Sequence, residues 1–214
     1  MNSRTDNNQS PDYAGYNAWE TNPLLKHVSD SLGAKPKEDL SRHGAWAGRA
    51  ETINLGRMAN INIPVLKQFS ARGERVDEVE FHPSWHALMR KGVEAGLHSS
   101  LWVRPESEAG RHNLARTSKV FITAGGDMGH LCPLIMTSAC VPVLTKHEGL
   151  SQEWLPKILS AKYDASNKPS LEKSGAVIHV ARDDRRMAAM QTALSFFAPD
   201  IPVLSFPAWD CLPY

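Results

Sequence analysis

The sequence predicts a mainly α-helical fold with a short βαβ appendage at its C-terminal end. Between residues 21 and 159, apolar residues recur at helical spacing, in segments that carry caps and stop residues. The longest apolar run, Phe121–Leu144, is the candidate core on which the other helices pack. Beyond Gly175 two short β-type runs flank one helical segment, which is typical of a βαβ unit.

The composition is that of an ordinary globular protein, since 42% of the 214 residues are hydrophobic and 22% are charged. A formal net charge of +1 gives no global electrostatic case for binding nucleic acid or an anionic membrane. The three cysteines are an odd number without metal-type spacing, and polar residues follow Met1 where a secretory signal would be apolar. We therefore expect a cytoplasmic protein. Glycines, Asp127 and His130 interrupt the longest apolar run, so we expect no membrane span.

Residues 1–20 are rich in Asn, Asp, Ser and Gln, which predicts an irregular N-terminal arm. Tyr13, Tyr16 and Trp19 are the side chains that would anchor this arm, either to the body of the protein or to a neighbouring subunit.

Two helices are predicted after the arm. Either Thr21 or Asn22 can cap the first helix, Pro23 fits its first turn, and Gly33 supplies a stop. The second helix is predicted over Glu38–Met58 and must end before Pro64.

Residues 61–80 are predicted to be a connection with a turn at Arg72–Glu74. His82 and Pro83 then open a helix. His82 and His86 share one helical face at a spacing that can hold a metal, but Pro83 stands where zinc proteases place a glutamate. We therefore predict a cap hydrogen bond and packing for these histidines, and no metal site.

A further helix is predicted from Arg111 to Thr123, followed by a tight turn at Gly125, Gly126 and Gly129 and a second helix entered through Cys132–Pro133. A glycine-rich turn before a helix can bind a phosphate group. This turn lacks the Lys and Ser/Thr of a P-loop, so a packing turn is the stronger interpretation.

Leu150–Leu159 is predicted to be an amphipathic helix with a kink or a late start at Pro156. Polar residues 163–174 are typical of a loop or linker. The βαβ appendage follows, with strands predicted at Ala176–Val180 and Val203–Phe206.

A family resemblance rests on three segments in the same order. These are LGRMANIN at residues 55–62, VEFHPSWHALM at 79–89 and GHLCPLIMT at 129–137. Together they resemble the N-terminal half of the AidB-type adaptive-response acyl-CoA dehydrogenases. The resemblance covers about residues 10–172, and it implies a helical N-terminal domain over residues 21–172.

A second resemblance begins where the first one stops. Residues 175–214, and FPAWDCLPY at 206–214 above all, resemble the N-terminal UvrB-like region of the transcription-repair coupling factor Mfd. This resemblance implies a separate fragment over residues 173–214, and therefore an apparent fusion with its junction near residues 171–175.

The first resemblance implies FAD as the cofactor of the family, held between a helical N-terminal domain, a middle β-domain and a C-terminal helical bundle that carries the catalytic glutamate. No counterpart of the flavin-binding segment or of that glutamate is recognisable here, so we assign no catalytic residue and expect this chain not to bind FAD alone. The resemblance places one wall of the cofactor site at Leu131, Cys132, Pro133, Met136 and Thr137. A stripe of Met and Cys at helical spacing is also typical of an ordinary core.

Two functional hypotheses follow. In the first, the chain is a truncated AidB-like flavoprotein of the DNA alkylation response that is not catalytically competent alone, so whether it is an enzyme stays open. In the second, the chain is a non-enzymatic binding module that recruits DNA or a UvrA-type repair partner. A homo-oligomer formed through the helical domain is compatible with either hypothesis.

Overall fold

The computed structural model describes residues 13–103, 109–167 and Thr192. The chain divides into two compact units, residues 1–177 and 178–214, and all the elements below belong to the first. The predicted βαβ appendage and the predicted junction lie outside the described residues, apart from Thr192, and stay predictions.

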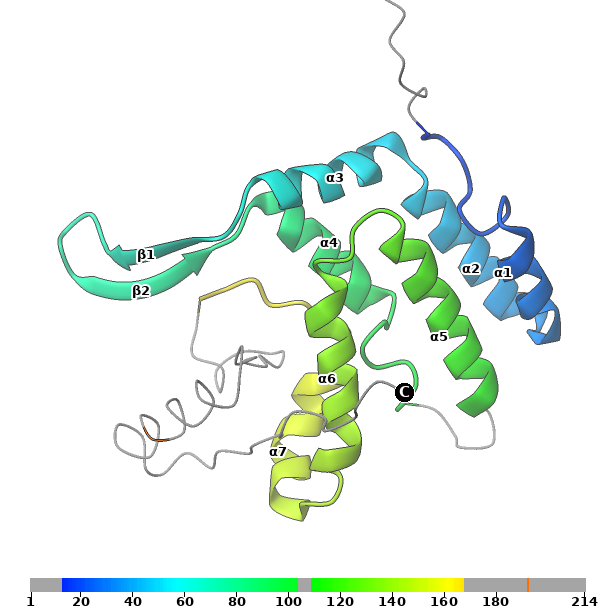
Figure 1. Ribbon diagram of the computed structural model, residues 1–214. Helices are drawn as coiled ribbons and strands as arrows, with labels where there is room; N and C mark the ends of the chain where they lie inside the picture. Colours follow the sequence, from blue (N-terminus) through cyan, green and yellow to red (C-terminus); the bar gives the residue numbers. More distant parts are fainter. Residues whose placement is uncertain (1–12, 104–108, 168–191, 193–214) are drawn as a thin grey trace, which may run out of the picture. The chain divides into compact units, whose positions relative to one another are not determined.

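The described part is mostly helical, which confirms the predicted fold class (Figure 1). Seven α-helices, one short 3₁₀ helix and one β-hairpin are present among the described residues. In chain order they are α1 (Pro23–Val28), η1 (Ser29–Ser31), α2 (Ala34–Ala47), α3 (Ala50–Ile61), β1 (Val65–Phe69), β2 (Arg75–Glu80), α4 (Pro83–Glu94), α5 (Ala109–Ala124), α6 (Leu131–Leu144) and α7 (Glu148–Ile158).

The helices pack in pairs, with α2 against α5, α3 against α4, α4 against α6, and α6 against α7. Each of the three buried apolar clusters lies at such contacts. One is centred on Leu40 and Ile122, the second on Leu97 and Leu134, and the third on Val141. The candidate core run therefore contributes to all three clusters.

The predicted helix over Glu38–Met58 is wrong, because two helices meet near Gly48. Residues 13–20 of the N-terminal arm lie against the end of α2, where Gly15 N–H donates to Gly48 O at 2.8 Å. A Cβ at Gly48 would lie 1.9 Å from the carbonyl oxygen of Tyr16. The close approach of the arm therefore requires glycine, and Arg49 then adopts an extended conformation before α3 begins.

The α2–α5 contact buries a histidine. His43 is 5% exposed, and its Nε2 lies 2.8 Å from Thr123 Oγ1. The Thr123 hydroxyl donates to Lys119 O, so Oγ1 accepts the proton of His43 Nε2. Burial, helped by the nearby charges of Lys119 and Lys91, lowers the pKa of His43 to about 4.

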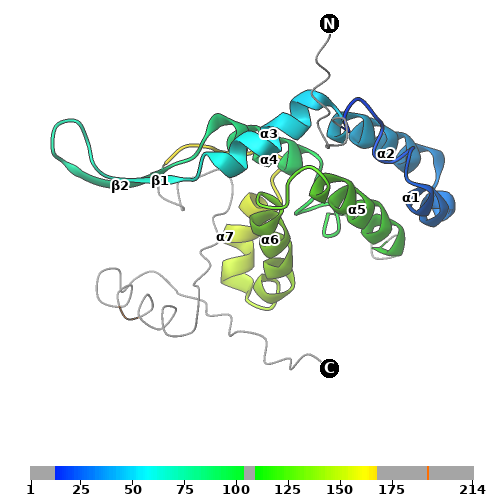
Figure 2. The same cartoon turned by 45° about the horizontal axis from the view of Figure 1, so that its top comes forward.

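The prediction of a plain connection over residues 61–80 is also wrong, because this segment forms an antiparallel hairpin (Figures 1 and 2). Its turn is where the sequence predicts it, with Gly73 at a φ of 80°. Every residue of both strands is exposed. In RVDEVE the two valines, Val76 and Val79, are three residues apart, so the apolar–polar alternation that predicts a strand is absent from this segment.

Some helix ends agree with the predicted chemistry, but the predicted stop at Gly33 is wrong, because α1 ends at Val28 and Gly33 instead precedes α2. His82 Nδ1 accepts from Ser84 N–H at 3.2 Å, which confirms the predicted cap of α4. His86 Nδ1 lies 2.8 Å from the Tyr163 hydroxyl.

Helix α7 starts at Glu148 and continues through Pro156, so the predicted late start is wrong. Among the described helices, none is long and apolar enough to cross a membrane.

Candidate functional site

Helix α6 is the element that carries the predicted site residues, and it is apolar on every side. Its sequence, LCPLIMTSACVPVL, contains no charged residue. One side is buried against α4 and α7, through Leu131, Leu134, Ser138, Val141 and Leu144. The opposite side is exposed through Cys132, Ile135, Ala139 and Pro142, which we call the exposed face of α6. A helix that is apolar all round is normally covered all round.

The five predicted wall residues divide between the two sides of α6. Leu131 is buried with Val93 and Leu97, so it supports the helix from below. Cys132 is exposed, and its Sγ lies 3.8 Å from Met136 Sδ one turn later. The structure therefore places this sulfur pair on or beside the exposed face.

Pro133 and Thr137 lie at the edge between the buried and the exposed side of α6, and both are half-buried. The Thr137 hydroxyl donates to Pro133 O at 2.7 Å, so its proton is already used within the helix. Thr137 can still accept a hydrogen bond from a partner.

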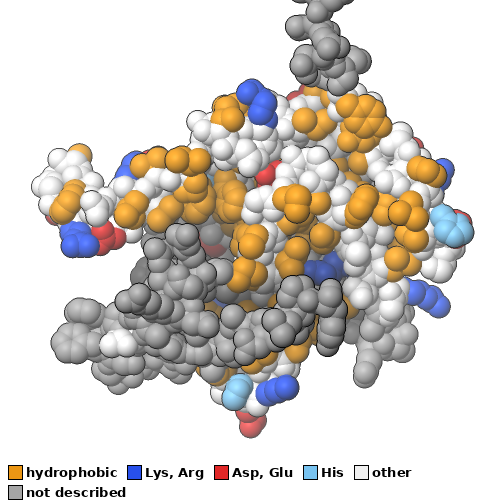
Figure 3. All heavy atoms as spheres, in the orientation of Figure 1, with side chains coloured by type: hydrophobic (Ala, Val, Ile, Leu, Met, Phe, Trp, Pro, Cys, Tyr) orange, Lys and Arg blue, Asp and Glu red, His pale blue; other side chains and the backbone are white. Residues whose placement is uncertain are grey.

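Two further apolar side chains are exposed on segments that precede α6 in the chain. Met128, in the turn before the helix, is 72% exposed, and Phe121 on α5 is 56% exposed. Hydrophobic side chains gather over α5, α6 and the hairpin in the space-filling view (Figure 3). Sequence reasoning missed Ile135, Met128 and Phe121 as surface residues, because a run that is apolar throughout gives no sign of which side is covered.

The α5–α6 turn is held by a buried polar cluster. Asp127 Oδ1 accepts from Asn60 Nδ2 at 2.8 Å, and Oδ2 accepts from His130 N–H at 3.1 Å. Burial alone would raise the pKa of Asp127, but the hydrogen bonds from His130 and Asn60 outweigh it and hold that pKa below its usual value. The turn predicted from Gly125, Gly126 and Gly129 is therefore a packed one, with a carboxylate where a bound anion would have to sit.

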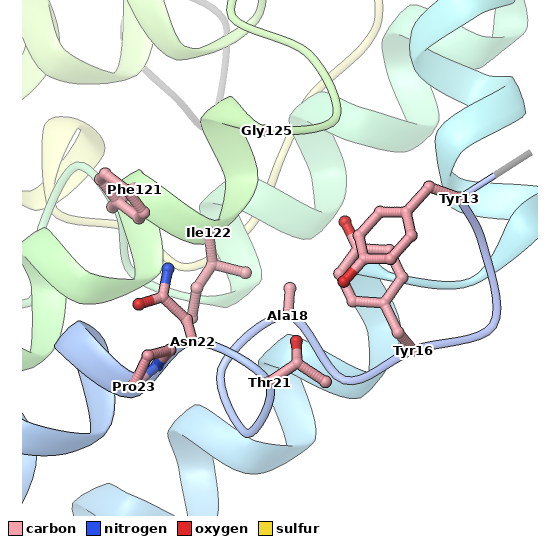
Figure 4. Close-up of a pocket in the computed structure, with 9 residues that line it drawn as sticks. All are labelled: Tyr13, Tyr16, Ala18, Thr21, Asn22, Pro23, Phe121, Ile122 and Gly125. Carbon is pink, nitrogen blue, oxygen red and sulfur yellow. The ribbon is translucent and has the colours of Figure 1, made fainter. Parts of the chain in front are cut away.

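A pocket of about 300 Å³ lies between the N-terminal arm and α5 (Figure 4). Tyr13 and Tyr16, with ring centroids 4.1 Å apart, line it together with Phe121, Ile122 and Gly125. None of the predicted site residues lines this pocket. The polar groups of its arm residues serve local structure, since Asn22 caps α1 and the Thr21 hydroxyl donates to Asn17 O.

The exposed face of α6 offers apolar surface and few groups for acid–base chemistry. Cys132 supplies its single titratable group, and the face contains no carboxylate, histidine or lysine. Over the ranges 13–103 and 109–167, no cluster of three His, Cys, Asp or Glu side chains is placed to hold a metal ion.

The sequence matches known proteins over this same region. Residues 8–165 match the family described as the adaptive response protein AidB N-terminal domain. A curated Escherichia coli protein named "Putative acyl-CoA dehydrogenase AidB" is 34% identical over 148 residues, which are 69% of this chain and 27% of that protein. The Caenorhabditis elegans protein "Acyl-CoA dehydrogenase family member 11" is 26% identical over 135 residues, 61% of this chain and 22% of that protein. The chain thus spans about a quarter of the length of these relatives.

Solved structures show the same fold. The crystal structure of Caenorhabditis elegans ACDH-11 in complex with C11-CoA matches with a TM-score of 0.63 and 23% identity, over 76% of this chain and 29% of that one. The apo form of Bd2924 matches with a TM-score of 0.64 and 20% identity, over 72% of this chain and 31% of that one. With a family match over residues 8–165, the chain belongs to the family of AidB N-terminal domains.

Proposed function

We propose that this chain provides one wall of the flavin and acyl-CoA site of an AidB-like acyl-CoA dehydrogenase. In this function the exposed face of α6 packs against the cofactor, the acyl chain or the domain that holds them. The described residues supply shape and an apolar surface, and the catalytic base comes from elsewhere in the complete site.

One observation carries this proposal: α6 is apolar on every side and is covered on only one. Exposure of apolar side chains to water is unfavourable, and this face consists of Cys132, Ile135, Ala139 and Pro142. Burying such side chains lowers the free energy by roughly 25 cal/mol per Å² of apolar surface. Two relatives are named as acyl-CoA dehydrogenases, and this supports a flavin or an acyl chain as the group that covers the exposed face of α6.

The wall residues differ in what they offer to FAD. Cys132 and Met136 present polarizable sulfur to a flat ring or an acyl chain, Thr137 offers an acceptor oxygen, and Pro133 stiffens the first turn. Leu131 lies beneath them in the core. The exposed face of α6 carries no lysine, arginine or histidine to pair with the diphosphate of FAD, so we assign its residues to the apolar parts of the cofactor site.

Reconstitution with the rest of a family member tests this function. The full chain is mixed with a separately expressed polypeptide that contains the middle and C-terminal domains of the Escherichia coli relative. We expect visible flavin absorbance to stay with the mixture through gel filtration, and acyl-CoA to bleach it. The chain alone and the second polypeptide alone serve as controls, and we expect the chain alone to retain no flavin.

A matched pair of variants ties the result to α6. Cys132→Arg places a charge on the exposed face and should abolish flavin retention, whereas Glu94→Arg on the exposed side of α4 should not. If the mixture never retains flavin, or if both variants behave alike, the proposal fails. Copies of the chain that associate through the same face would appear in gel filtration as a larger species, which Cys132→Arg should remove.

The alternative of a DNA-binding or UvrA-binding module receives no such support. It depends on the resemblance of residues 175–214, and the described residues add nothing to it. We therefore leave it as a prediction from sequence.

A further inference from the structure

Two deeply enclosed, chemically active side chains, Asp127 and His130, lie directly before α6. The side chains of His130 and Asp127 are 0% and 3% exposed. Charged and polar groups are rarely buried to this degree unless they are paired. The flavin wall does not use this pair, so it calls for a separate explanation.

The hydrogen bonds fix the protonation of the pair. His130 Nδ1 lies 2.5 Å from Asp127 Oδ2, and because a carboxylate only accepts, Nδ1 carries the proton. His130 Nε2 is buried and has no hydrogen-bond partner in the described part of the chain. A protonated Nε2 would leave a buried donor unpaired, which costs more than a bare lone pair. The pair is thus a carboxylate with a neutral imidazole, in agreement with burial that lowers the pKa of His130 against the pull of Asp127.

Three helices meet at this pair. Asn60, near the end of α3, donates to Asp127, and a Cβ at Gly56 would lie only 2.4 Å from Gly126 O in the turn. On the other side, a Cβ at Gly92 of α4 would lie 2.5 Å from Leu134 Cδ1 and 3.8 Å from the His130 ring. The backbones of α3 and α4 therefore approach the turn and the start of α6 closely from two sides.

The first turn of α6 depends on this arrangement. The position before the helix is His130, whose own side chain makes no cap hydrogen bond, and the backbone N–H of His130 is bound instead by Asp127. A carboxylate at this end also favours the helix dipole. Cys132 and Met136 follow within two turns of this anchor.

We propose that Asp127 and His130 are positioning residues that fix the exposed face of α6 relative to α3 and α4. The neutral His130 side chain donates a hydrogen bond to Asp127. Asp127 links two helices, because it accepts hydrogen bonds both from Asn60 of α3 and from His130 at the start of α6. The value of this positioning for a flavin site depends on the proposed function. The geometry itself can be tested on the full chain without any cofactor.

The tautomer of His130 gives the first test. The full chain is labelled with ¹⁵N-histidine, and the His130 signals are assigned by their loss in His130→Asn. We expect the Nδ1–H tautomer in the native chain, and loss of this form in Asp127→Asn. A native His130 that carries its proton on Nε2 or on both nitrogens would overturn the inference.

The position of α6 gives the second test, read from ¹³C-methyl signals of Met128 and Met136. His130→Leu keeps the size but removes the donor, and should shift both signals by more than their line widths. His130→Asn restores a donor near Nδ1 and should return them toward native positions, while the exposed control His27→Asn should leave them unchanged. Unmoved signals in His130→Leu, or no rescue by His130→Asn, would mean that the pair does not position α6.

The two proposals fail separately. If reconstitution gives no flavin complex while Met128 and Met136 respond as expected, the proposed function fails and the positioning role stands. If His130→Leu does not fold, the tautomer of the native chain still decides the geometry. A flavin complex that is equally tight with His130→Asn and His130→Leu would refute the positioning role alone.

Discussion

Helices α4 and α6 pack against each other, but their solvent-exposed sides differ in composition. The exposed positions of α4 include Arg90 and Glu94, so its outer side is polar. The exposed face of α6 is made of Cys132, Ile135, Ala139 and Pro142. The outer side of α4 thus has the polar composition of an ordinary solvent-exposed surface, whereas the outer side of α6 has the apolar composition of a protein core. This difference in composition is the observation on which the proposed function of α6 depends.

The largest expected difference lies between two neighbours on α6. Leu134 is 2% exposed and Ile135 is 44% exposed. Leu134→Ala should lower the free energy of unfolding by about 2–5 kcal/mol, because it leaves a cavity in the α4–α6 contact. Ile135→Ala should change it by less than about 0.5 kcal/mol. Urea unfolding of the full chain measures both, and equal losses would show that the two sides of α6 are equally buried.

Acid titration tests a buried polar contact on another helix pair, α2 and α5. The pKa of His43 is about 4 in the folded chain, below its usual 6.5. The unfolded chain therefore binds the proton first, and stability is lost as the pH falls from 6.5 toward 4, by up to about 3 kcal/mol. His43→Gln keeps a donor for Thr123 and should flatten this part of the stability curve. An unchanged pH slope in His43→Gln would remove His43 as its cause.

A glycine substitution sharpens the account of the packed turn. Gly56→Ala brings a Cβ to 2.4 Å from Gly126 O, which is backbone and cannot rotate away. We expect a loss of about 1–3 kcal/mol from overpacking, despite the better helix propensity of Ala. Gly149 in α7 has nothing within 4 Å of its built Cβ, so Gly149→Ala should be neutral or slightly stabilising. Both variants are compared by thermal unfolding, and a neutral Gly56→Ala would contradict the close contact.

The smallest effect on stability is expected for substitutions on the exposed sides of α6 and α4. Ile135→Lys should leave the urea midpoint within error and raise the solubility of the chain, because it divides an exposed apolar surface. Glu94→Leu on α4 should lower the solubility of the chain, again with little effect on stability. Light scattering at increasing protein concentration measures both. A large loss of stability in Ile135→Lys would show that this side of α6 is already covered in the chain alone.

Local chemistry made much of the fold predictable. Pro23, His82 and Gly73 act through their own backbone and nearest neighbours, so the start of α1, the cap of α4 and the turn at 70–74 follow from sequence. The break at Gly48 did not follow, because it depends on the arm passing over α2 from about 30 residues earlier in the chain. The hairpin did not follow for a different reason, since Val76 and Val79 are three residues apart and β2 therefore lacks the alternation that predicts a strand.

The candidate site divides in the same way. The sequence by itself determined the family, the helical class and the helix that carries Cys132, Met136 and Thr137, because these depend on motifs and on local periodicity. Only the tertiary structure decided which side of α6 is exposed, since a helix that is apolar throughout has no sequence signal for its covered side. It also decided that Asn60, Asp127 and His130 meet, because α3 and the α5–α6 turn are 67 residues apart in the chain and come together only through helix packing.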